Sequence, residues 1–428
     1  MNRQATRNAL LALAVTASVG ATSLAPAHAT AAAGNHPKGP AAAVAPAGAH
    51  EATQAALHKA VEKGGLPGIS AEVLDRTGTW NGSAGVADTA TGRKRSADEH
   101  FRAGSITKMF IATVILQLAD EGRLSLDDKV EKWLPGLVRG NKNDGRTISL
   151  QELLNHTSGL YSHTDDEEFK VNASGKNFPE HRYDTYTPEQ LVAVAMQHTP
   201  KPDAHTNPWY SNTNYVLAGM VIEKVTGHSY AYEATQRIIK PLKLHDTSFP
   251  GTAAQLPSPH PVAYSRLHDE NPDAPIHDAT EQNMSWLGAS GELISTTGDL
   301  NRFERALIRG ELLPPARMKE MLEEVPAGHE TGYGLGVEFA TLNCGIQVVG
   351  KTGRTNGSLS GVVGTADGEK QLTFNINGDW LTDSAVYTDV IEAEFCGKPG
   401  PPPPPKPPPP QPPPAGGRTP APPPRRHT

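Results

Sequence analysis

The sequence lacks several features that would each mark a class of protein. The formal net charge of −7 is mild and spread along 428 residues, and nothing resembles the face of clustered Lys and Arg that nucleic-acid binding needs, so we expect no nucleic-acid partner. No H-E-x-x-H motif is present, and His156 and His163 lack a metal-ligand spacing, so a zinc hydrolase is poorly supported. We expect neither a metal nor a cofactor. Hydrophobic residues make up 37% of the chain, which is enough for a folded core.

The apolar run near the N-terminus is too short to span a bilayer comfortably. It covers Ala9–Val19, follows Arg3 and Arg7, and precedes Ala27-His28-Ala29. A basic start, a short apolar run and an A-x-A site are typical of a secretory signal peptide. We therefore expect residues 1–29 to be removed and the mature protein to be exported without a membrane span. A retained membrane anchor is the alternative.

Cysteine is scarce, with Cys344 and Cys396 as the only two residues of this type. In an exported chain an even number favours a disulfide, because the compartment does not keep thiols reduced. Such a bridge would close a loop of about fifty residues and stabilise the fold by roughly 2–4 kcal/mol. Two unpaired buried thiols are the alternative.

Low-complexity segments flank the part of the chain that is expected to fold. Residues 30–50 are mostly Ala, Pro and Gly and indicate a flexible linker. Residues 399–428 form a proline-rich tail, whose composition favours an extended polyproline helix. The tail ends in Arg425-Arg426-His427, which could touch an anionic cell wall, although a solvated spacer is the simpler interpretation. One compact domain is expected over residues 51–398.

The spacing of apolar residues predicts a mixed α/β fold. Helices are expected over residues 51–63, 105–122, 149–154, 188–196, 214–225 and 384–395. Strands are expected over residues 68–74, 333–339, 345–349, 359–365 and 371–376. A further strand is expected after the turn at residues 75–78 and ends at Val86. Strands and a helix at both ends, with a helical middle over about 123–290, indicate one sheet built from both termini plus an all-helical insertion.

The run Ser105-Ile106-Thr107-Lys108 opens the second helical segment. On a helix, the Ser-x-x-Lys spacing puts both side chains one turn apart on the same face. If burial or a neighbouring cation lowers the pKa of the lysine, its neutral amine can take the serine proton. The pattern occurs about once by chance in a chain of this length. An N-cap serine followed by a solvated lysine is the alternative.

A second motif, Tyr210-Ser211-Asn212, precedes an apolar helical run. A tyrosine beside a lysine can shuttle a proton when the cation depresses the pKa of the phenol. The Asn212 amide can hold a substrate carbonyl or fix the lysine in place. Taken alone, Tyr210 is more simply a loop residue at a helix boundary.

The third motif, Lys351-Thr352-Gly353, is expected at the end of a strand that reads Ile346-Gln347-Val348-Val349-Gly350. The edge of such a strand can receive a peptide substrate as an added strand. Gly353 would let the substrate backbone approach without a Cβ in the way. Lys351 would supply positive charge to the catalytic group, and Thr352 a hydroxyl for a carboxylate. A charged turn after a strand is the alternative.

Each motif is weak alone, but their order and spacing together indicate a serine acyl-transfer enzyme with Ser105 as its nucleophile. In this combination the chain resembles the serine β-lactamase and penicillin-binding protein superfamily. The Tyr-x-Asn element, where class A enzymes carry Ser-Asp-Asn, is the class C form. The resemblance is closest to the secreted D-alanyl-D-alanine carboxypeptidases of actinomycetes and covers about residues 51–398. It includes the runs Phe101-Arg102-Ala103-Gly104-Ser105, His156-Thr157-Ser158-Gly159-Leu160-Tyr161, Glu223-Lys224-Val225-Thr226-Gly227-His228-Ser229 and Phe395-Cys396-Gly397-Lys398-Pro399.

This resemblance implies a three-layer α/β domain, with an antiparallel sheet flanked by helices, plus an all-helical domain and an active site between them. It implies proton transfer by Lys108 and Tyr210 and an oxyanion hole formed by the backbone N–H groups of Ser105 and Arg354. Trp286 matches a tryptophan that lines the cleft of the family, although a large apolar residue is more often core packing. Both cysteines fall where the carboxypeptidase has its disulfide partners.

The chain also departs from the carboxypeptidase pattern. It has Lys351-Thr352-Gly353-Arg354 where that enzyme has His-Thr-Gly-Thr, and Ser358 where it has a tyrosine. Glu338 stands where the carboxypeptidase has an arginine for the terminal carboxylate of the substrate. An acid there would repel a carboxylate unless it is turned away. Arg354 could substitute, because its planar guanidinium suits a carboxylate.

We therefore expect a secreted, monomeric serine D-alanyl-D-alanine carboxypeptidase, or a close relative that acts on D-amino-acid peptides. Its partners would be peptidoglycan-type D-peptides and β-lactams. A class C-like β-lactamase or an esterase of the same fold is the second hypothesis. A non-catalytic penicillin-binding sensor or wall-binding protein is the third, and only the proline-rich tail favours it.

Overall fold

The computed structural model describes residues 50–204, 208–325, 332–380 and 385–397. The predicted signal peptide (1–29), the linker up to residue 49 and the proline-rich tail (399–428) lie outside the described residues. All three motifs lie inside them. Among the helices of the described part, none combines the length and the apolar character needed to cross a bilayer.

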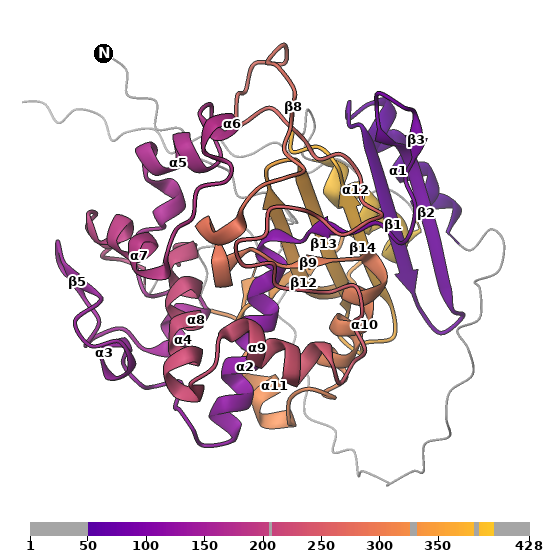
Figure 1. The fold of residues 1–428 in the computed structure, drawn as a ribbon. Coiled ribbons are helices and arrows are strands. Elements are labelled where there is room, and N and C mark those ends of the chain that lie inside the picture. The colour runs from indigo at the N-terminus through magenta and orange to yellow at the C-terminus, as the bar shows by residue number, and fades with distance from the viewer. Residues whose placement is uncertain (1–49, 205–207, 326–331, 381–384, 398–428) are drawn as a thin grey trace, which may run out of the picture.

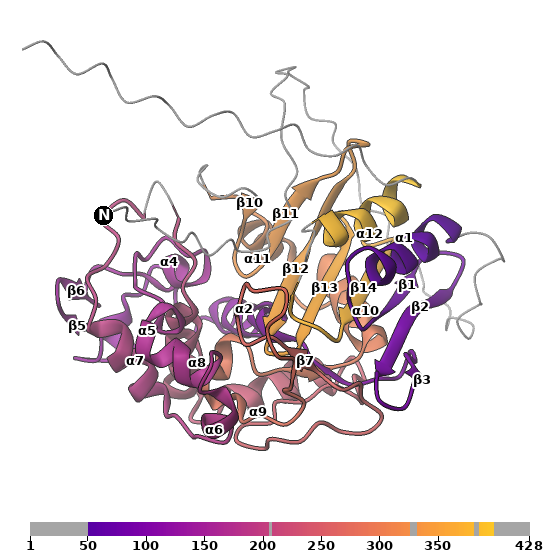
Figure 2. The same cartoon turned by 90° about the horizontal axis from the view of Figure 1, so that it is seen from above.

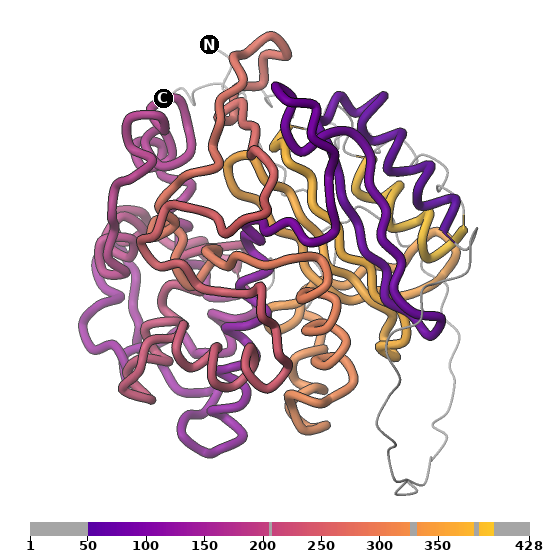
Figure 3. Tube along the Cα trace, turned by 45° about the vertical axis from the view of Figure 1, so that its right-hand side comes forward, coloured from indigo at the N-terminus to yellow at the C-terminus, as the bar shows by residue number. Residues whose placement is uncertain are grey.

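An eight-stranded antiparallel sheet forms the centre of the fold, in the order β10-β11-β12-β13-β14-β1-β2-β3. Its strands are β1 (Gly68–Leu74), β2 (Thr79–Asp88), β3 (Arg93–Lys94), β10 (Gly332–Tyr333), β11 (Glu338–Thr341), β12 (Gln347–Thr355), β13 (Ser358–Thr365) and β14 (Gln371–Ile376). β1 pairs with β14, so that Ile69 faces Ile376. The first and last strands of the chain therefore lie side by side, indigo beside yellow in Figure 3. The prediction of one sheet built from both ends of the chain is confirmed.

Helices cover both faces of this sheet (Figures 1 and 2). α1 (Glu51–Glu62) and α12 (Ala385–Cys396) pack together on one face, and α10 (Thr297–Ile308) packs on the other. Because both faces are covered, β14 is buried at every position, as in sheets enclosed between two layers of helices. The three-layer α/β arrangement implied by the resemblance is confirmed.

A mostly helical part lies beside the sheet, in magenta in Figure 1. Its centre is α2 (Thr107–Asp120), which is buried on nearly all sides and packs against α8 (Asn212–Thr226). An all-round apolar helix of this kind belongs in a protein core. The other helices are α3 (Val130–Trp133), α4 (Leu150–Leu154), α5 (Glu167–Ala173), α6 (Phe178–His181), α7 (Pro188–Met196), α9 (Tyr230–Ala234) and α11 (Pro315–Met321).

The insertion expected over residues 123–290 is not purely helical. It contains two short antiparallel ribbons, β5 (Arg139–Gly140) with β6 (Asn143–Asp144), and β7 (Tyr264–Ser265) with β8 (His277–Asp278). Tyr264 also forms a bridge with Gly378, just after β14. The end of the insertion is therefore tied to the sheet, a long-range contact that helical spacing does not reveal. A third short ribbon pairs β4 (Phe101–Arg102) with β9 (Ile294–Ser295).

Two strand predictions were wrong in detail. Segment 333–339 is not one strand: a turn that includes Gly336, with φ at +82°, separates β10 from β11. The run 351–353 does not follow the end of a strand but lies inside β12. The reason is that β13 continues to pair with β12 as far as Thr355, where a two-residue turn joins them.

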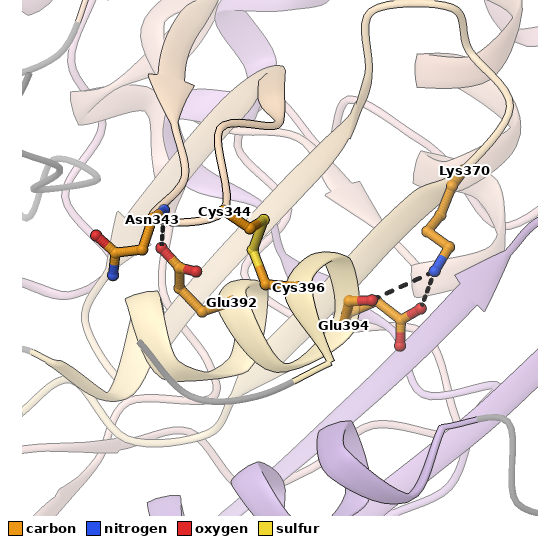
Figure 4. Close-up of a disulfide and its surroundings, with 6 residues drawn as sticks. All are labelled: Asn343, Cys344, Lys370, Glu392, Glu394 and Cys396. Atoms are coloured by element: carbon orange, nitrogen blue, oxygen red, sulfur yellow. Dashed lines mark hydrogen bonds and ion pairs between the residues drawn. A yellow bond between two sulfur atoms is a disulfide. The ribbon is translucent and has the colours of Figure 1, made fainter. Parts of the chain in front are cut away.

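Cys344 is bonded to Cys396, which confirms the disulfide and excludes two free thiols. The bond joins the turn between β11 and β12 to the last residue of α12, and Figure 4 shows it beside Glu392. Glu392 accepts a hydrogen bond from the Asn343 backbone N–H at 2.8 Å. Cys344, Glu392 and Cys396 are close enough together to resemble a metal site, but both sulfurs are already used in the disulfide.

Candidate active site

Ser105 lies in a short 3-10 turn, η1 (Gly104–Ile106), that leads into α2. Gly104 has a φ of +56°, and a Cβ on it would lie 2.6 Å from the backbone nitrogen of Arg354. Glycine is required here because it accepts positive φ and leaves room for a second backbone. The nucleophile therefore lies directly beside β12, and it is only partly buried.

Gly353 makes the same approach from the other side. A Cβ on Gly353 would lie 1.9 Å from the carbonyl oxygen of Ala103, which is closer than any side chain can pack. A glycine is therefore needed at position 353 because β12 packs closely against the segment before Ser105. Its predicted contact with a substrate backbone stays a prediction.

Lys108 lies one helical turn after Ser105 and is fully buried. Its Nζ is 3.1 Å from Ser105 Oγ, 2.7 Å from Asn212 Oδ1 and 2.7 Å from the carbonyl oxygen of Ser290. Burial lowers the pKa of Lys108 well below its usual value, and the Lys351 ammonium lowers it further. A neutral amine can donate to Asn212 and Ser290 and keep its lone pair for the Ser105 proton.

Asn212 serves mainly to hold this lysine. Its Nδ2 donates to Thr164 Oγ1 at 2.9 Å and its backbone N–H donates to Ser162 Oγ at 3.1 Å, so the amide orientation is defined. Of the two functions predicted for Asn212, the structure shows the one that fixes Lys108. Contact with a substrate carbonyl stays a prediction.

Tyr210 makes the second contact to the nucleophile, because its hydroxyl donates to Ser105 Oγ at 2.8 Å. Burial raises the pKa of the phenol, and the Glu338 carboxylate raises it further. Tyr210 is therefore protonated at neutral pH. This corrects the expectation that a neighbouring cation would depress its pKa, because desolvation outweighs the other effects on this phenol.

His156 supports Tyr210 from behind, with 4.2 Å between the two ring centres. Its Nδ1 accepts the backbone N–H of Ser211 at 3.2 Å, so the ring proton of neutral His156 is on Nε2. That nitrogen lies 3.2 Å from Tyr333 Oη. Both ring nitrogens are thus used in packing the site, as expected for a structural histidine.

The third motif faces a buried carboxylate. Lys351 (1% exposed) forms an ion pair with Glu338 (5% exposed), whose Oε2 accepts hydrogen bonds from the backbone N–H and the hydroxyl of Thr352, each at 3.1 Å. Lys351 Nζ also lies 5.3 Å from the centre of the Tyr210 ring. Lys351 and Thr352 therefore lie beside the group of Ser105, Lys108 and Tyr210. The Glu338 carboxylate points toward Lys351 and Thr352 and away from solvent.

Arg354 offers a backbone donor and a charged side chain. Because N–H groups alternate along a strand, the Arg354 N–H points to the same edge of β12 as the Thr352 N–H that bonds Glu338. This direction suits the oxyanion hole implied with Ser105, a role that stays a prediction. The guanidinium is exposed, and one of its N–H groups donates to the Asp379 carbonyl at 3.0 Å.

Trp286, a predicted substrate-binding residue, is buried. It lies in η4 (Met284–Trp286), is 8% exposed, and belongs to the large hydrophobic core around α2. Its carbonyl oxygen lies 2.9 Å from Nε2 of His163, a buried histidine whose pKa is lowered by desolvation to about 4. The burial agrees with core packing, and contact with a substrate stays a prediction.

Two features of the site were missed by sequence reasoning. The Ser290 carbonyl, at the end of η5 (Gly288–Ser290), binds Lys108 through its backbone, and any residue type could supply this group. The pairing of Glu338 with Lys351 was missed because the turn before β11 was not recognised. If the start of β11 at Glu338 had been predicted, its pairing with β12 would have placed Glu338 opposite Gly350, one residue before Lys351.

The chain matches known proteins over most of its length. Residues 53–382 match the family described as Beta-lactamase. A D-stereospecific amidohydrolase from Streptomyces sp. has a similar structure, with 50% sequence identity and a TM-score of 0.76 over 82% of this chain and 99% of that chain. The D-amino acid amidase from Ochrobactrum anthropi SV3 complexed with L-phenylalanine amide is 27% identical, with a TM-score of 0.69 over 81% and 98% of the two chains.

Among curated proteins, penicillin-binding protein 4 of Amycolatopsis lactamdurans is 29% identical over 244 residues, which are 56% of this chain and 59% of that protein. The chain spans between about half and three fifths of the length of these curated relatives. The match to the family itself covers nearly the whole described domain, including Ser105, Lys108, Tyr210 and Lys351. The chain therefore belongs to the beta-lactamase family, as a serine hydrolase of that fold.

Proposed function

We propose that this protein hydrolyses amide bonds whose acyl part is a D-amino acid, through an acyl-enzyme on Ser105. The observation that carries the proposal is the position of Ser105 Oγ, 3.1 Å from the Lys108 amine and 2.8 Å from the Tyr210 hydroxyl. The substrate class is supported by the 50% identity to a D-stereospecific amidohydrolase.

In the first step Ser105 Oγ attacks the amide carbonyl while its proton passes to the Lys108 amine. Charge develops on the carbonyl oxygen, where the backbone N–H groups of Ser105 and Arg354 would stabilise it. The C–N bond then breaks, and the leaving nitrogen takes a proton from the Tyr210 hydroxyl. Lys108 passes the proton that it took from Ser105 to Tyr210, so the hydroxyl is restored. Water then attacks the carbonyl carbon of the ester and gives a proton to the pair of Tyr210 and Lys108. The bond between that carbon and Ser105 Oγ breaks, Ser105 Oγ takes the proton back, and the D-amino acid is released.

Hydrolysis of D- and L-phenylalanine amide by the wild type and by Ser105→Ala tests the proposal. We expect release of D-phenylalanine only, and no turnover by the variant. Ser96→Ala, which removes a serine on an exposed segment, is the matched control and should keep full activity. Equal rates on both enantiomers, or turnover by Ser105→Ala, would contradict the proposal.

A D-alanyl-D-alanine carboxypeptidase is the second candidate, favoured by the similarity to penicillin-binding protein 4 and by the exposed Arg354 guanidinium. Release of D-alanine from a peptide ending in D-Ala-D-Ala tests it. If this release is faster than hydrolysis of the amide, the carboxypeptidase replaces the amidohydrolase as the proposed function.

Mass spectrometry of the intact protein after addition of benzylpenicillin separates the remaining hypotheses. A long-lived adduct on Ser105 argues against a β-lactamase, which would hydrolyse it rapidly. Turnover of any amide or ester, abolished in Ser105→Ala, excludes a sensor without catalytic activity.

A further inference from the structure

Glu338 lies at the place where a ligand would meet the edge of β12. β11 pairs with β12 only from Gln347 to Gly350, so within the described chain the segment 351–355 has no strand partner on that side. Such a free edge offers N–H groups to an added strand or to an anion. The first of these groups, the N–H of Thr352, is already bonded to the Glu338 carboxylate at 3.1 Å.

The same carboxylate takes the other donors of the motif. Glu338 pairs with the Lys351 ammonium and accepts from the Thr352 hydroxyl at 3.1 Å. An ammonium, a backbone N–H and a hydroxyl that converge on one point form a binding site for a carboxylate. In this protein the carboxylate that fills the site is part of the chain.

Filling the site has two consequences for a substrate. The Lys351 ammonium is already paired with Glu338 in a buried position, where Glu338 is 5% and Lys351 1% exposed. An incoming carboxylate would also meet the negative charge of Glu338 at close range, and like charges placed together at a binding interface are strongly unfavourable. A neutral leaving group meets neither obstacle.

We propose that Glu338 is a specificity-determining residue, an internal carboxylate that excludes leaving groups with a terminal carboxylate and restricts the enzyme to uncharged amides and esters. The proposal rests on the proposed function for the bond that is cleaved, and it concerns only the group that departs. It also explains why an acid, Glu338, stands where the carboxypeptidase pattern has an arginine. The Glu338 carboxylate occupies the place that the terminal carboxylate of a substrate would take.

A competing explanation is that Glu338 serves only to hold Lys351 and so to adjust Lys108. In that case its removal would change the rates for charged and neutral leaving groups by the same factor. The ratio of the two rates therefore distinguishes specificity from support, whatever happens to either rate alone.

The first experiment compares D-phenylalanyl-D-alanine with D-phenylalanyl-D-alaninol, which share the cleaved bond and differ in a carboxylate or a hydroxymethyl group. We expect kcat/KM of the wild type to favour the alaninol by about tenfold or more. Glu338→Gln keeps the shape but removes the charge, and should lower this preference by at least about tenfold. Glu338→Asp, which keeps the charge, and Glu131→Gln, which removes a charge on α3, should retain the preference.

A second experiment does not depend on D-peptide turnover. Acylation of Ser105 is followed by intact mass with benzylpenicillin and with its methyl ester, which lacks the carboxylate. The wild type should react faster with the ester, and Glu338→Gln should gain most with the free acid. If neither D-peptide is cleaved, the proposed function fails while this acylation ratio still tests the role of Glu338.

A wild type that prefers the carboxylate in both experiments overturns the inference, even if Glu338→Gln does not fold. An unchanged ratio in a folded Glu338→Gln variant overturns it as well and leaves Glu338 as a support for Lys351.

Discussion

At the scale of single residues, the proposed mechanism requires Lys108 to be uncharged. Burial and the Lys351 ammonium both lower its pKa, so Lys108 should become protonated, and activity should be lost, only well below the usual pH range of a lysine. We expect kcat/KM to fall as the pH decreases through this pKa. Lys351→Gln removes the positive charge that lowers the pKa of Lys108, so this pKa should rise. The fall of kcat/KM on the acid side of the pH profile should therefore move to higher pH. The pH dependence of kcat/KM for a D-amino acid amide measures this shift.

Lys132→Gln is a suitable control, because Lys132 is exposed on α3 and pairs with Asp128 away from the site. Its acid limb should coincide with that of the wild type. A limb in Lys351→Gln that stays in place or moves to lower pH would show that Lys351 does not set the protonation of Lys108.

At the scale of elements, the site depends on the contact between β12 and the turn before Ser105. Gly353→Ala would place a methyl group 1.9 Å from the Ala103 carbonyl oxygen, so β12 must move. Overpacking of this kind costs about 1–3 kcal/mol of stability, and a shift of the nucleophile by about 1 Å can cost about a hundredfold in rate. We expect both effects, measured by urea unfolding and by kcat/KM.

Gly145→Ala is the matched control, because its nearest neighbour would be a side-chain atom at 3.2 Å in the helical part. It should lose much less activity. Full activity in a stable Gly353→Ala variant would show that β12 and the nucleophile do not need this close approach.

A second element-scale prediction concerns α10, where Glu304 points its fully buried carboxyl at the sheet. Burial raises the pKa of this carboxyl well above 4.5, against smaller opposing effects of the Gln371 side chain and the Arg305 charge. The folded state therefore keeps a proton that the unfolded state releases above pH 4.5, so this group makes stability fall as the pH rises. Glu304→Met should stabilise the protein by about 1–3 kcal/mol at pH 8.

The gain should shrink near pH 4, where Glu304 is protonated in both states. Urea unfolding at the two pH values measures it, with Glu311→Met, an exposed position, as the control. A gain that is equal at both pH values would be due to packing and not to the proton that Glu304 must take up on folding.

At the scale of the whole molecule, the disulfide holds the C-terminal helix to the sheet. Cys344 and Cys396 are 52 residues apart, and the loop that they close contains β12, β13, β14 and α12. Replacing both by Ser should lower the free energy of unfolding by about 2–4 kcal/mol, because the unfolded chain gains freedom. The bond lies near the start of β12, away from Arg354, so kcat/KM at 25 °C should not change.

Reduction of the wild type gives an independent measure, and it should lower stability by the same amount as the double variant. No loss in either case would mean that the helix is held by its apolar contacts alone. Export of the protein, which the N-terminal segment predicts and which agrees with a disulfide, stays a prediction.

The sequence by itself determined the elements that carry their information locally. Helix α7 and strands β1 and β14 have the predicted bounds, because periodic apolar spacing and turn residues act over a few neighbours. Ser105, Lys108 and Tyr210 were identified in the same way, since their chemistry requires those residue types in motifs of three or four positions. The structure adds that they meet at one point.

Only the tertiary structure decided which groups surround the nucleophile. The Ser290 carbonyl lies 182 residues from Lys108, and Glu338 meets Lys351 through the register of two strands. The lowered pKa of Lys108 and the protonated state of Tyr210 follow from burial, which no motif encodes. Local sequence specifies which chemistry is present, whereas register and burial decide its charge, and the charge at Glu338 and Lys351 is what we propose selects the leaving group.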